Sequence, residues 1–357
     1  MKSDKIKVVH ITPLSKEEIL EKPSNYSYYI KDMLQDNRFE VILVNPNQYS
    51  KYNRFKGSLM LIKDIRKISP HILYISSLLG LNFLVVCRAL RIIKCKIFIW
   101  KYTFCKTGNN SIHKFLLKHI YWKNISRIYM AYPKHTEHAI EYKIVKKDQI
   151  VTLSRGVEYR WYQQFIAPQK RGGETITVIA TGKDNRDYDT LCKACELSNT
   201  NCIIYTRKHP NCINSSLKFK DSKYCKFFFM EDIKTDDEYN FIMKQVGKAN
   251  VLAICCTNCS YGVGYTNLIE GLPFKIPILI TDNPYALINV EKEEIGYNIA
   301  LSDINDWVNK LNVLKNNPSI CLQMGENIDK LLQKDWNSVT TFNFIANDIL
   351  NHVKTIK

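Results

Sequence analysis

Acidic residues are scarce in the first half of this chain of 357 residues. Between residues 51 and 127 a single carboxylate, that of Asp64, accompanies 16 lysines and arginines. Residues 1–165 hold 29 basic and 12 acidic residues, whereas residues 166–357 hold 22 of each, so the first half accounts for the net charge of +17. Because a surface of one sign attracts partners of the other sign, we expect the first half to meet a negatively charged partner.

Long hydrophobic runs are missing as well. The longest uncharged stretch, residues 68–87, is interrupted by serine, proline, histidine and asparagine, whereas a helix that spans a bilayer needs about 20 mostly apolar residues. The first residues, MKSDKIKVVHIT, lack the apolar core of a secretory signal. These absences predict a cytoplasmic protein, soluble or peripheral on the inner face of the cytoplasmic membrane.

The twelve cysteines do not have the spacing of a zinc site. Two CxxC pairs, Cys192–Cys195 and Cys256–Cys259, lie about 60 residues apart, which is far from the spacing of a zinc ribbon. Cys192 and Cys195 also fall in a helical pattern, where cysteine packs as a small apolar side chain. We therefore expect no metal and a reducing compartment.

Short β-branched or aromatic runs alternate with helical patterns along the chain. The expected strands are 6–12, 39–44, 72–75, 96–100, 128–131, 150–153, 176–180, 202–205, 226–230, 251–254 and 278–281. The expected helices are 25–35, 58–67, 82–93, 111–123, 134–143, 186–197, 235–248, 266–274, 303–316, 319–333 and 337–354. Such alternation is typical of parallel sheets covered by helices on both faces.

A break at residues 159–174, with Pro168, Gly172 and Gly173, reads as a linker. We predict an α/β protein with two Rossmann-like, doubly wound domains that face a central cleft. The first domain comprises residues 1–160 and the second residues 161–337, and the helix at 338–357 packs back on the first. A ligand is expected at the carboxyl ends of the strands.

Residues 260–284 have the pattern of a ligand-binding turn. A loop with Gly262 and Gly264 enters a helix that carries Glu270. Small residues let the backbone approach a ligand, and a helix N-terminus presents N–H groups to anions. Glu270 would then reach the hydroxyls of a ribose beside the phosphates. The local pattern leaves a second interpretation open, a surface turn with a solvated glutamate.

Two further turns follow expected strands. After the strand at 176–180 come Gly182, Lys183 and Arg186, where a doubly wound domain points residues into its ligand site. These cations suit a diphosphate leaving group. The alternative interpretation is that they are solvated surface residues of a loop. The strand at 150–153 leads into a glycine turn at the domain boundary, which is a candidate hinge.

Together these segments resemble family 4 (group 1) glycosyltransferases of the GT-B fold. The segment 154–158 (SRGVE) is similar to the family's interdomain signature, and 182–188 to the turn that opens its second domain. Residues 268–282 (LIEGLPFKIPILITD) are similar to the family's donor-binding segment. Gly296, Asp303 and Trp307 fall where many relatives have a glycine turn, an aspartate cap and a helix with tryptophan.

The resemblance implies transfer of a sugar from a nucleotide-sugar donor, UDP- or GDP-linked, usually with retention of the anomeric configuration and without a cofactor or metal. Lys183 and Arg186 would contact the diphosphate and Glu270 the ribose. The other donor-binding positions would be Gly182, Gly262, Gly264 and the residues at the helix start, Tyr265, Thr266, Asn267 and Leu268. The first domain would bind a glycan or lipid-linked acceptor, as in the synthesis of a surface polysaccharide such as capsule or lipopolysaccharide, or of a glycolipid.

The sequence also departs from the family pattern. Gly262 stands where the family often has a first glutamate, so a non-catalytic GT-B scaffold or partner subunit is the alternative function. The usual histidine after the fourth strand is replaced by the region of Lys101 and Tyr102, and His113 lies further on. We place Lys101 and His113 on the acceptor side, although a histidine such as His113 is more often a helix-surface residue.

Three partners fit the basic half. Nucleic acid fits the charge alone, and the chain shows none of the usual recognition motifs. A solvated basic face is the second interpretation. The third, which we favour, is an anionic membrane surface met by residues 51–127, because residues 111–123 (SIHKFLLKHIYWK) alternate lysines with apolar and aromatic residues.

Overall fold

The structure is a computed structural model that describes residues 5–76, 81–166, 176–259 and 261–354. The chain divides into two compact units, Met1–Glu158 with Ser338–Lys357, and Tyr159–Asn337. Residues 167–175, which include Pro168, Gly172 and Gly173 of the expected linker, lie outside the described residues.

The first unit contains a six-stranded parallel sheet in the order β2-β1-β3-β4-β5-β6. Its strands are β1 (Ile6–Ile11), β2 (Phe39–Val44), β3 (Ile72–Ile75), β4 (Lys96–Lys101), β5 (Arg127–Met130) and β6 (Ile150–Thr152). The central strand β3 is buried along its whole length. Helices must therefore cover both faces of the sheet, which explains why its strands read as continuous apolar runs.

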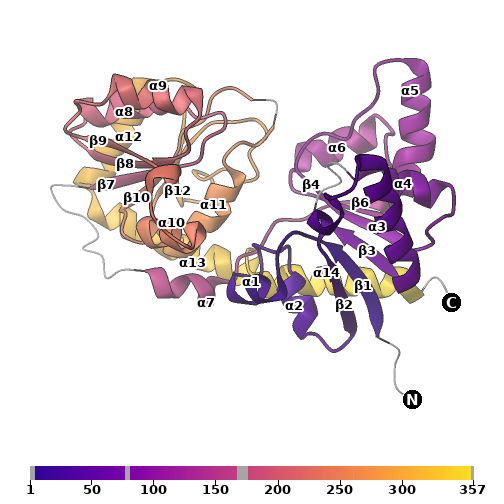
Figure 1. Cartoon of the computed structure of the whole chain (residues 1–357). Coiled ribbons are helices and arrows are strands. Elements are labelled where there is room, and N and C mark those ends of the chain that lie inside the picture. Colours follow the sequence, from indigo (N-terminus) through magenta and orange to yellow (C-terminus); the bar gives the residue numbers. More distant parts are fainter. Residues whose placement is uncertain (1–4, 77–80, 167–175, 260, 355–357) are drawn as a thin grey trace. The chain divides into compact units, whose positions relative to one another are not determined.

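Each face of this sheet has its own core. One core is formed with α1 (Lys16–Glu21), α2 (Ile30–Gln35) and α14 (Ser338–Lys354), and the other with α3 (Arg54–Ile68), α4 (Asn82–Ala89) and α6 (Pro133–Glu141). The terminal helix α14, yellow in Figure 1, runs past α1 and α2, shares a core with them and buries Ile345 and Ile349. Its Asp348 accepts hydrogen bonds from Arg127 at 2.7 Å and Tyr129 at 2.9 Å.

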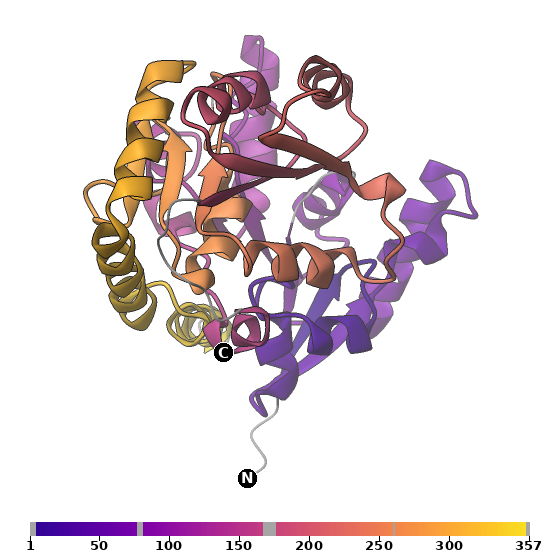
Figure 2. The same ribbon diagram turned by 90° about the vertical axis from the view of Figure 1, so that its left-hand side faces the viewer.

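The second unit repeats the architecture with the order β12-β11-β10-β7-β8-β9, again parallel throughout. Its strands are β7 (Thr177–Thr181), β8 (Asn201–Thr206), β9 (Cys225–Phe229), β10 (Val251–Ile254), β11 (Ile278–Thr281) and β12 (Gly296–Ile299). Its helices are α7 (Tyr159–Tyr162), α8 (Tyr188–Leu197), α9 (Pro210–Lys218), α10 (Glu238–Val246), α11 (Tyr265–Gly271), α12 (Ile304–Asn316) and α13 (Pro318–Lys334). In Figure 2 the orange-to-yellow α12 and α13 run beside the strands of this sheet.

All eleven expected strands occur, with ends within one residue of the prediction. The strand β12 was not expected, and neither were α1, α7 and α9. Gly296, expected in a turn, instead begins β12. A side chain there would collide with the backbone carbonyl of Ile278 on β11, so glycine is what allows the two strands to pair.

Several expected helices are shorter than the sequence pattern suggested, and two of them matter for the candidate sites. The helix expected at 25–35 begins only at Ile30, because Tyr28 and Tyr29 have the left-handed backbone conformation, with φ of 55° and 67°. The helix expected at 111–123 divides into α5 (Ser111–Leu116), a π-helical turn (Leu117–Tyr121) and a 3₁₀ turn (Trp122–Asn124). Both changes affect residues beside candidate sites.

Candidate active site

The turn after β7 is shaped by a glycine and an arginine. Gly182 has a φ of +106°, which non-glycine residues rarely adopt. A Cβ atom at this position would also lie only 2.5 Å from Nη2 of Arg186. The turn therefore needs glycine both for its backbone conformation and to make room for the Arg186 guanidinium.

Arg186 connects two sequence segments that were predicted separately. Its guanidinium donates to the Thr181 carbonyl at 3.1 Å, to the Asp184 carbonyl at 3.1 Å and to the Asn267 side-chain oxygen at 2.5 Å. The Asn267 amide in turn donates to the hydroxyl of Thr181. The structure thus brings Gly182, Arg186 and Asn267 together at the carboxyl end of β7 and the start of α11. In a doubly wound sheet this edge is where ligands bind.

The start of α11 is pressed against the sheet. Gly264, the N-cap, has a φ of +86°, and a side chain there would collide with Ile254 on β10. The N–H groups of a first helical turn have no acceptors within the helix, so such a turn can bind an anion. Thr266 is exposed in this turn, whereas the amide of Leu268 donates to the Gly264 carbonyl at 2.9 Å and is engaged within the helix.

Glu270 is half-buried and is not a solvated surface residue. It faces Tyr239 of α10, whose hydroxyl lies 2.8 Å from that of Tyr162. Burial raises the pKa of Tyr239 well above its usual value, and the charge of Glu270 and hydrogen bonds with Tyr162 and Glu270 raise it further. Tyr239 therefore stays a neutral donor that orients the Glu270 carboxylate. A carboxylate has lone pairs for several donors, so Glu270 can still accept from a ligand.

Lys183 differs from Arg186 in its surroundings. Its side chain is exposed and forms no ion pair with any carboxylate in the part of the chain that the structure describes. A lysine on a flexible stem beside a rigid turn can follow a charged group as it moves. Of the two predicted cations, Arg186 is fixed by hydrogen bonds and Lys183 is held only by its backbone.

The expected hinge, residues 154–158, is bonded into the first unit. The Gly156 carbonyl accepts from the Tyr29 hydroxyl at 2.8 Å, and its amide donates to Thr341 of α14 at 3.1 Å. The Glu158 carboxylate accepts from the Ser24 amide at 2.8 Å and from Lys31 at 2.9 Å. The loop before α2 and the helix α14 therefore fix the last residues of this unit.

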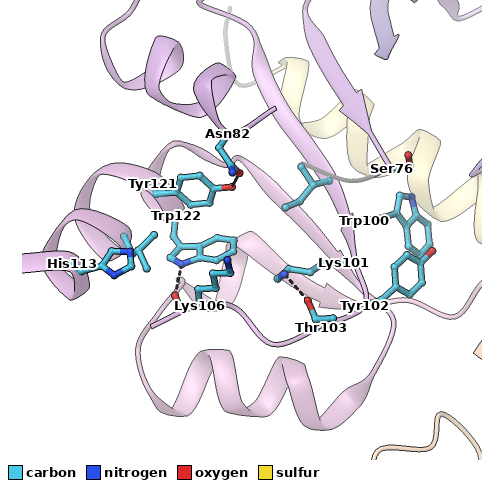
Figure 3. A pocket seen from close by; sticks show the side chains of 12 residues that line it. Ser76, Asn82, Trp100, Lys101, Tyr102, Thr103, Lys106, His113, Tyr121 and Trp122 are labelled. Carbon is cyan, nitrogen blue, oxygen red and sulfur yellow. Dashed lines mark hydrogen bonds between the residues drawn. The ribbon is translucent and has the colours of Figure 1, made fainter. Parts of the chain in front are cut away.

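In the first unit, Lys101 and His113 line one cavity of about 560 Å³. Lys101 ends β4 and donates to the Thr103 hydroxyl at 3.0 Å, whereas His113 belongs to α5 (Figure 3). Burial lowers the pKa of Lys101, and the nearby charge of Lys106 adds to this lowering. The structure thus brings together the two residues that were placed on the acceptor side.

The sequence did not single out Lys106 for this cavity, and it assigned Tyr121 and Trp122 to a surface helix. Trp122 is instead buried, and its indole N–H donates to the Lys106 carbonyl at 2.9 Å. The Tyr121 hydroxyl donates to the Asn82 side-chain oxygen at 2.7 Å. A run of aromatic residues next to a lysine-rich loop was the signal available, but the π-helical turn that redirects it has no clear sequence pattern.

Apolar side chains remain exposed on the same helix. Ile112 is 74% exposed and Phe115 59% exposed, and the lysines Lys114 and Lys118 beside them are exposed as well. No helix among the described residues is long and apolar enough to cross a membrane. Within the described residues, no group of three or more histidine, cysteine, aspartate or glutamate side chains is arranged to hold a metal ion.

Neither a family model nor a curated protein matches the chain. Solved structures match it over nearly its full length. A glycosyltransferase from Rickettsia africae ESF-5 has 14% identity, covers 97% of this chain and 98% of its own, and gives a TM-score of 0.68. Anabaena Alr3699/HepE in complex with UDP-glucose has 11% identity, with 97% and 100% covered and a TM-score of 0.66. A UDP-N-acetylglucosamine 2-epimerase has 10% identity, with 99% and 97% covered and a TM-score of 0.63.

These matches establish the fold. Two units, each with a parallel six-stranded sheet and helices, form the GT-B architecture, as the sequence predicted. The same fold occurs in transferases and in an epimerase, so the activity has to be argued from the site. The matched HepE structure holds UDP-glucose, which is the class of ligand expected for this chain.

Proposed function

We propose that this protein is a glycosyltransferase that moves a sugar from a UDP- or GDP-sugar to a glycan or lipid-linked acceptor. The observation that carries the proposal is the cluster of Gly182, Arg186 and Asn267, which joins the end of β7 to the start of α11. It combines a fixed guanidinium with the first turn of a helix, the combination that suits a diphosphate. The names of the structural neighbours, which concern UDP-sugars, agree with this ligand class.

In this reaction the bond between the anomeric carbon and the diphosphate oxygen breaks as an acceptor hydroxyl bonds to that carbon, and the hydroxyl proton passes to the departing diphosphate. Negative charge then grows on the diphosphate. Arg186 and Lys183 stabilise that charge, the former from a fixed position and the latter from a flexible stem, and Glu270 accepts from the ribose hydroxyls. Preorganised cations of this kind lower the barrier because they need little rearrangement as charge develops. We infer retention of the anomeric configuration from the resemblance to family 4.

The direct test is a thermal-shift panel with UDP, GDP and their sugars. A ligand that binds only the folded state at about 100 times its Kd stabilises it by about 2.7 kcal/mol. We expect a clear shift with one nucleotide series, and no shift with any member would contradict the proposal in favour of a non-catalytic scaffold. Gly262, in place of the family's first glutamate, is the observation that favours that scaffold.

The role of Glu270 is tested by Glu270→Ala, with Glu293→Ala as a control at an exposed glutamate of the same unit. We expect Glu270→Ala to remove most donor hydrolysis and transfer, and the control to keep both. Product analysis separates transfer from epimerisation, since only transfer requires an acceptor. Unchanged kinetics in Glu270→Ala would exclude the assigned role.

We further propose that the protein is peripheral on an anionic membrane, which it meets through residues 51–127. The support is the exposed pair Ile112 and Phe115 on α5, with the exposed lysines Lys114 and Lys118 beside them. Apolar side chains that enter the interface and lysines that stay at the headgroups suit such a surface. A lipid-linked acceptor would then be delivered to the unit that carries Lys101 and His113.

A further inference from the structure

The cavity of the first unit pairs aromatic walls with cations and no carboxylate. Its described lining includes Lys101, Lys106 and His113 and contains no aspartate or glutamate. From this we infer that the cavity binds a saccharide that carries a phosphate or carboxylate group. The inference rests on the proposed function, because the bound saccharide would be the acceptor.

The aromatic walls are held in place before any ligand arrives. Tyr121 and Trp122 are consecutive in sequence, yet both line the cavity, because the π-helical turn ends between them. Their rings are perpendicular, at 87° with centroids 5.0 Å apart, and hydrogen bonds to Asn82 and Lys106 fix them. Trp122 is buried and supports the half-buried Tyr121, so the Tyr121 ring is the surface on which the C–H face of a sugar ring can pack. A rigid aromatic ring offers apolar area at a low entropic cost.

The cations are placed for an anionic substituent on that ring. The Lys101 ammonium lies 5.9 Å from the centroid of the Trp122 ring and is partly buried (Figure 3). A cation taken out of water is costly, and a bound anion offsets that cost. Nδ1 of His113 accepts from the Asn109 amide at 3.4 Å, so the neutral ring carries its proton on Nε2 and can donate it to a ligand.

The positive lining continues beyond this cavity. Two neighbouring cavities, of about 510 and 550 Å³, also include Lys106. Their described lining residues again contain no aspartate or glutamate, and they add Lys114, Lys118 and His138. A chain of saccharide units with more than one anionic group would meet cations along the whole path.

Isothermal titration calorimetry on the full chain tests the inference. The probes are glucose 1-phosphate, glucuronate, neutral glucose and inorganic phosphate. We expect both anionic saccharides to bind at least tenfold more tightly than glucose or inorganic phosphate alone, because the site recognises the ring and the charge together. Equal affinity for glucose and glucose 1-phosphate, or for phosphate and glucose 1-phosphate, would overturn the inference.

The variant Lys101→Gln/Lys106→Gln removes both cations. We expect it to weaken binding of glucose 1-phosphate at least tenfold, whereas Lys147→Gln, at an exposed lysine outside the three cavities, leaves binding unchanged. Thermal unfolding of each variant checks that it is folded. Unchanged affinity in the folded double variant would refute the assignment of the site.

A second experiment tests whether the anionic saccharide is lipid-linked or soluble. Nanodiscs that carry a polyprenyl-phosphate-linked glucose are compared with soluble glucose 1-phosphate. Tighter binding to these nanodiscs than to the same nanodiscs without the linked glucose identifies a lipid-linked acceptor, and equal binding identifies a soluble one. The UDP-glucose thermal shift of the double variant stays at the wild-type value, because the donor residues lie in the second unit. A wild-type protein that binds anionic saccharides but no nucleotide would refute the proposed transferase and leave this binding site intact.

Discussion

The two units have the same architecture and use charge in opposite ways. In the second unit, basic residues are tied to carboxylates, as in Lys218–Asp189 at 2.6 Å and Lys275–Asp329 at 2.6 Å. In the first unit, residues 51–126 contain a single carboxylate, that of Asp64, which accepts a hydrogen bond from the Tyr49 hydroxyl at 2.6 Å. Exposed lysines of this segment, such as Lys114 and Lys118, can therefore meet an external anion, whereas the neutral second unit relies on a few cations that the fold has positioned.

This difference separates two ways of binding an anion. A positioned cation such as Arg186 is part of a hydrogen-bond network and acts on one place in a ligand. A group of exposed lysines attracts a charged surface or chain over a wide area, and this attraction weakens as the salt concentration rises. We expect substitutions in the second unit to change the rate of the reaction. Substitutions in the first unit should change membrane binding and the binding of the acceptor.

The largest expected effect is that of Arg186→Ala. Loss of the guanidinium removes a donor to the leaving diphosphate and leaves the Thr181 carbonyl without its side-chain partner. We expect kcat to fall by about 100- to 1,000-fold. Steady-state kinetics with Lys226→Ala, at an exposed lysine of the same unit, as the control measures this. A loss of less than tenfold would contradict the role assigned to Arg186.

The next effect concerns the exposed apolar residues of the first unit. Ile112→Glu/Phe115→Glu should weaken binding to vesicles of phosphatidylglycerol at least tenfold, since burial of each side chain is worth about 1.5–3 kcal/mol. Co-sedimentation measures it. Leu217→Glu, at a residue of α9 that is 61% exposed, is the matched control in the second unit. An equal loss of vesicle binding in both variants would contradict the proposal that the first unit meets the membrane.

A third prediction concerns a buried acid of the first unit. Burial raises the pKa of Asp32 from 3.8 to about 6, against a hydrogen bond from Ser24 that lowers it. The folded state therefore binds a proton more tightly than the unfolded state. The free energy of unfolding should rise as the pH falls from 7 to 4, by up to about 3 kcal/mol.

Denaturant unfolding at a series of pH values measures this change, with Asp32→Asn as the comparison. The amide cannot titrate, so the variant should lose most of the pH dependence between pH 4 and 7. The same slope in both proteins would assign the effect to another group.

The smallest effect is expected for Tyr239→Phe. Removal of the hydroxyl takes away the hydrogen bond that orients Glu270 and the contact with Tyr162. A hydrogen bond of this kind is worth about 0.5–1.5 kcal/mol, so we expect KM for the donor to rise about two- to tenfold. The kcat value should change less, and an effect on kcat alone would argue against a positioning role.

The predicted strands were readable from the sequence because each is a short run of three to six residues rich in β-branched or aromatic side chains. The exception, β12, has the sequence Gly-Tyr-Asn-Ile and two half-buried residues, so no apolar run marks it. Gly182 and Arg186 were recognisable because they follow a strand directly. Their contact with Asn267, some 80 residues further along the chain, leaves no local pattern.

By itself the sequence determined where eleven of the twelve described strands lie along the chain, the position of the basic half and the segments that hold the candidate donor residues. These properties follow from local composition, which fixes whether a segment can be buried. Only the tertiary structure decided that Arg186 bonds to Asn267, that Glu270 faces Tyr239, and that Trp122 lines a cavity beside Lys101. Such contacts join residues on different elements, and they depend on packing and on local breaks in helix geometry that composition does not encode.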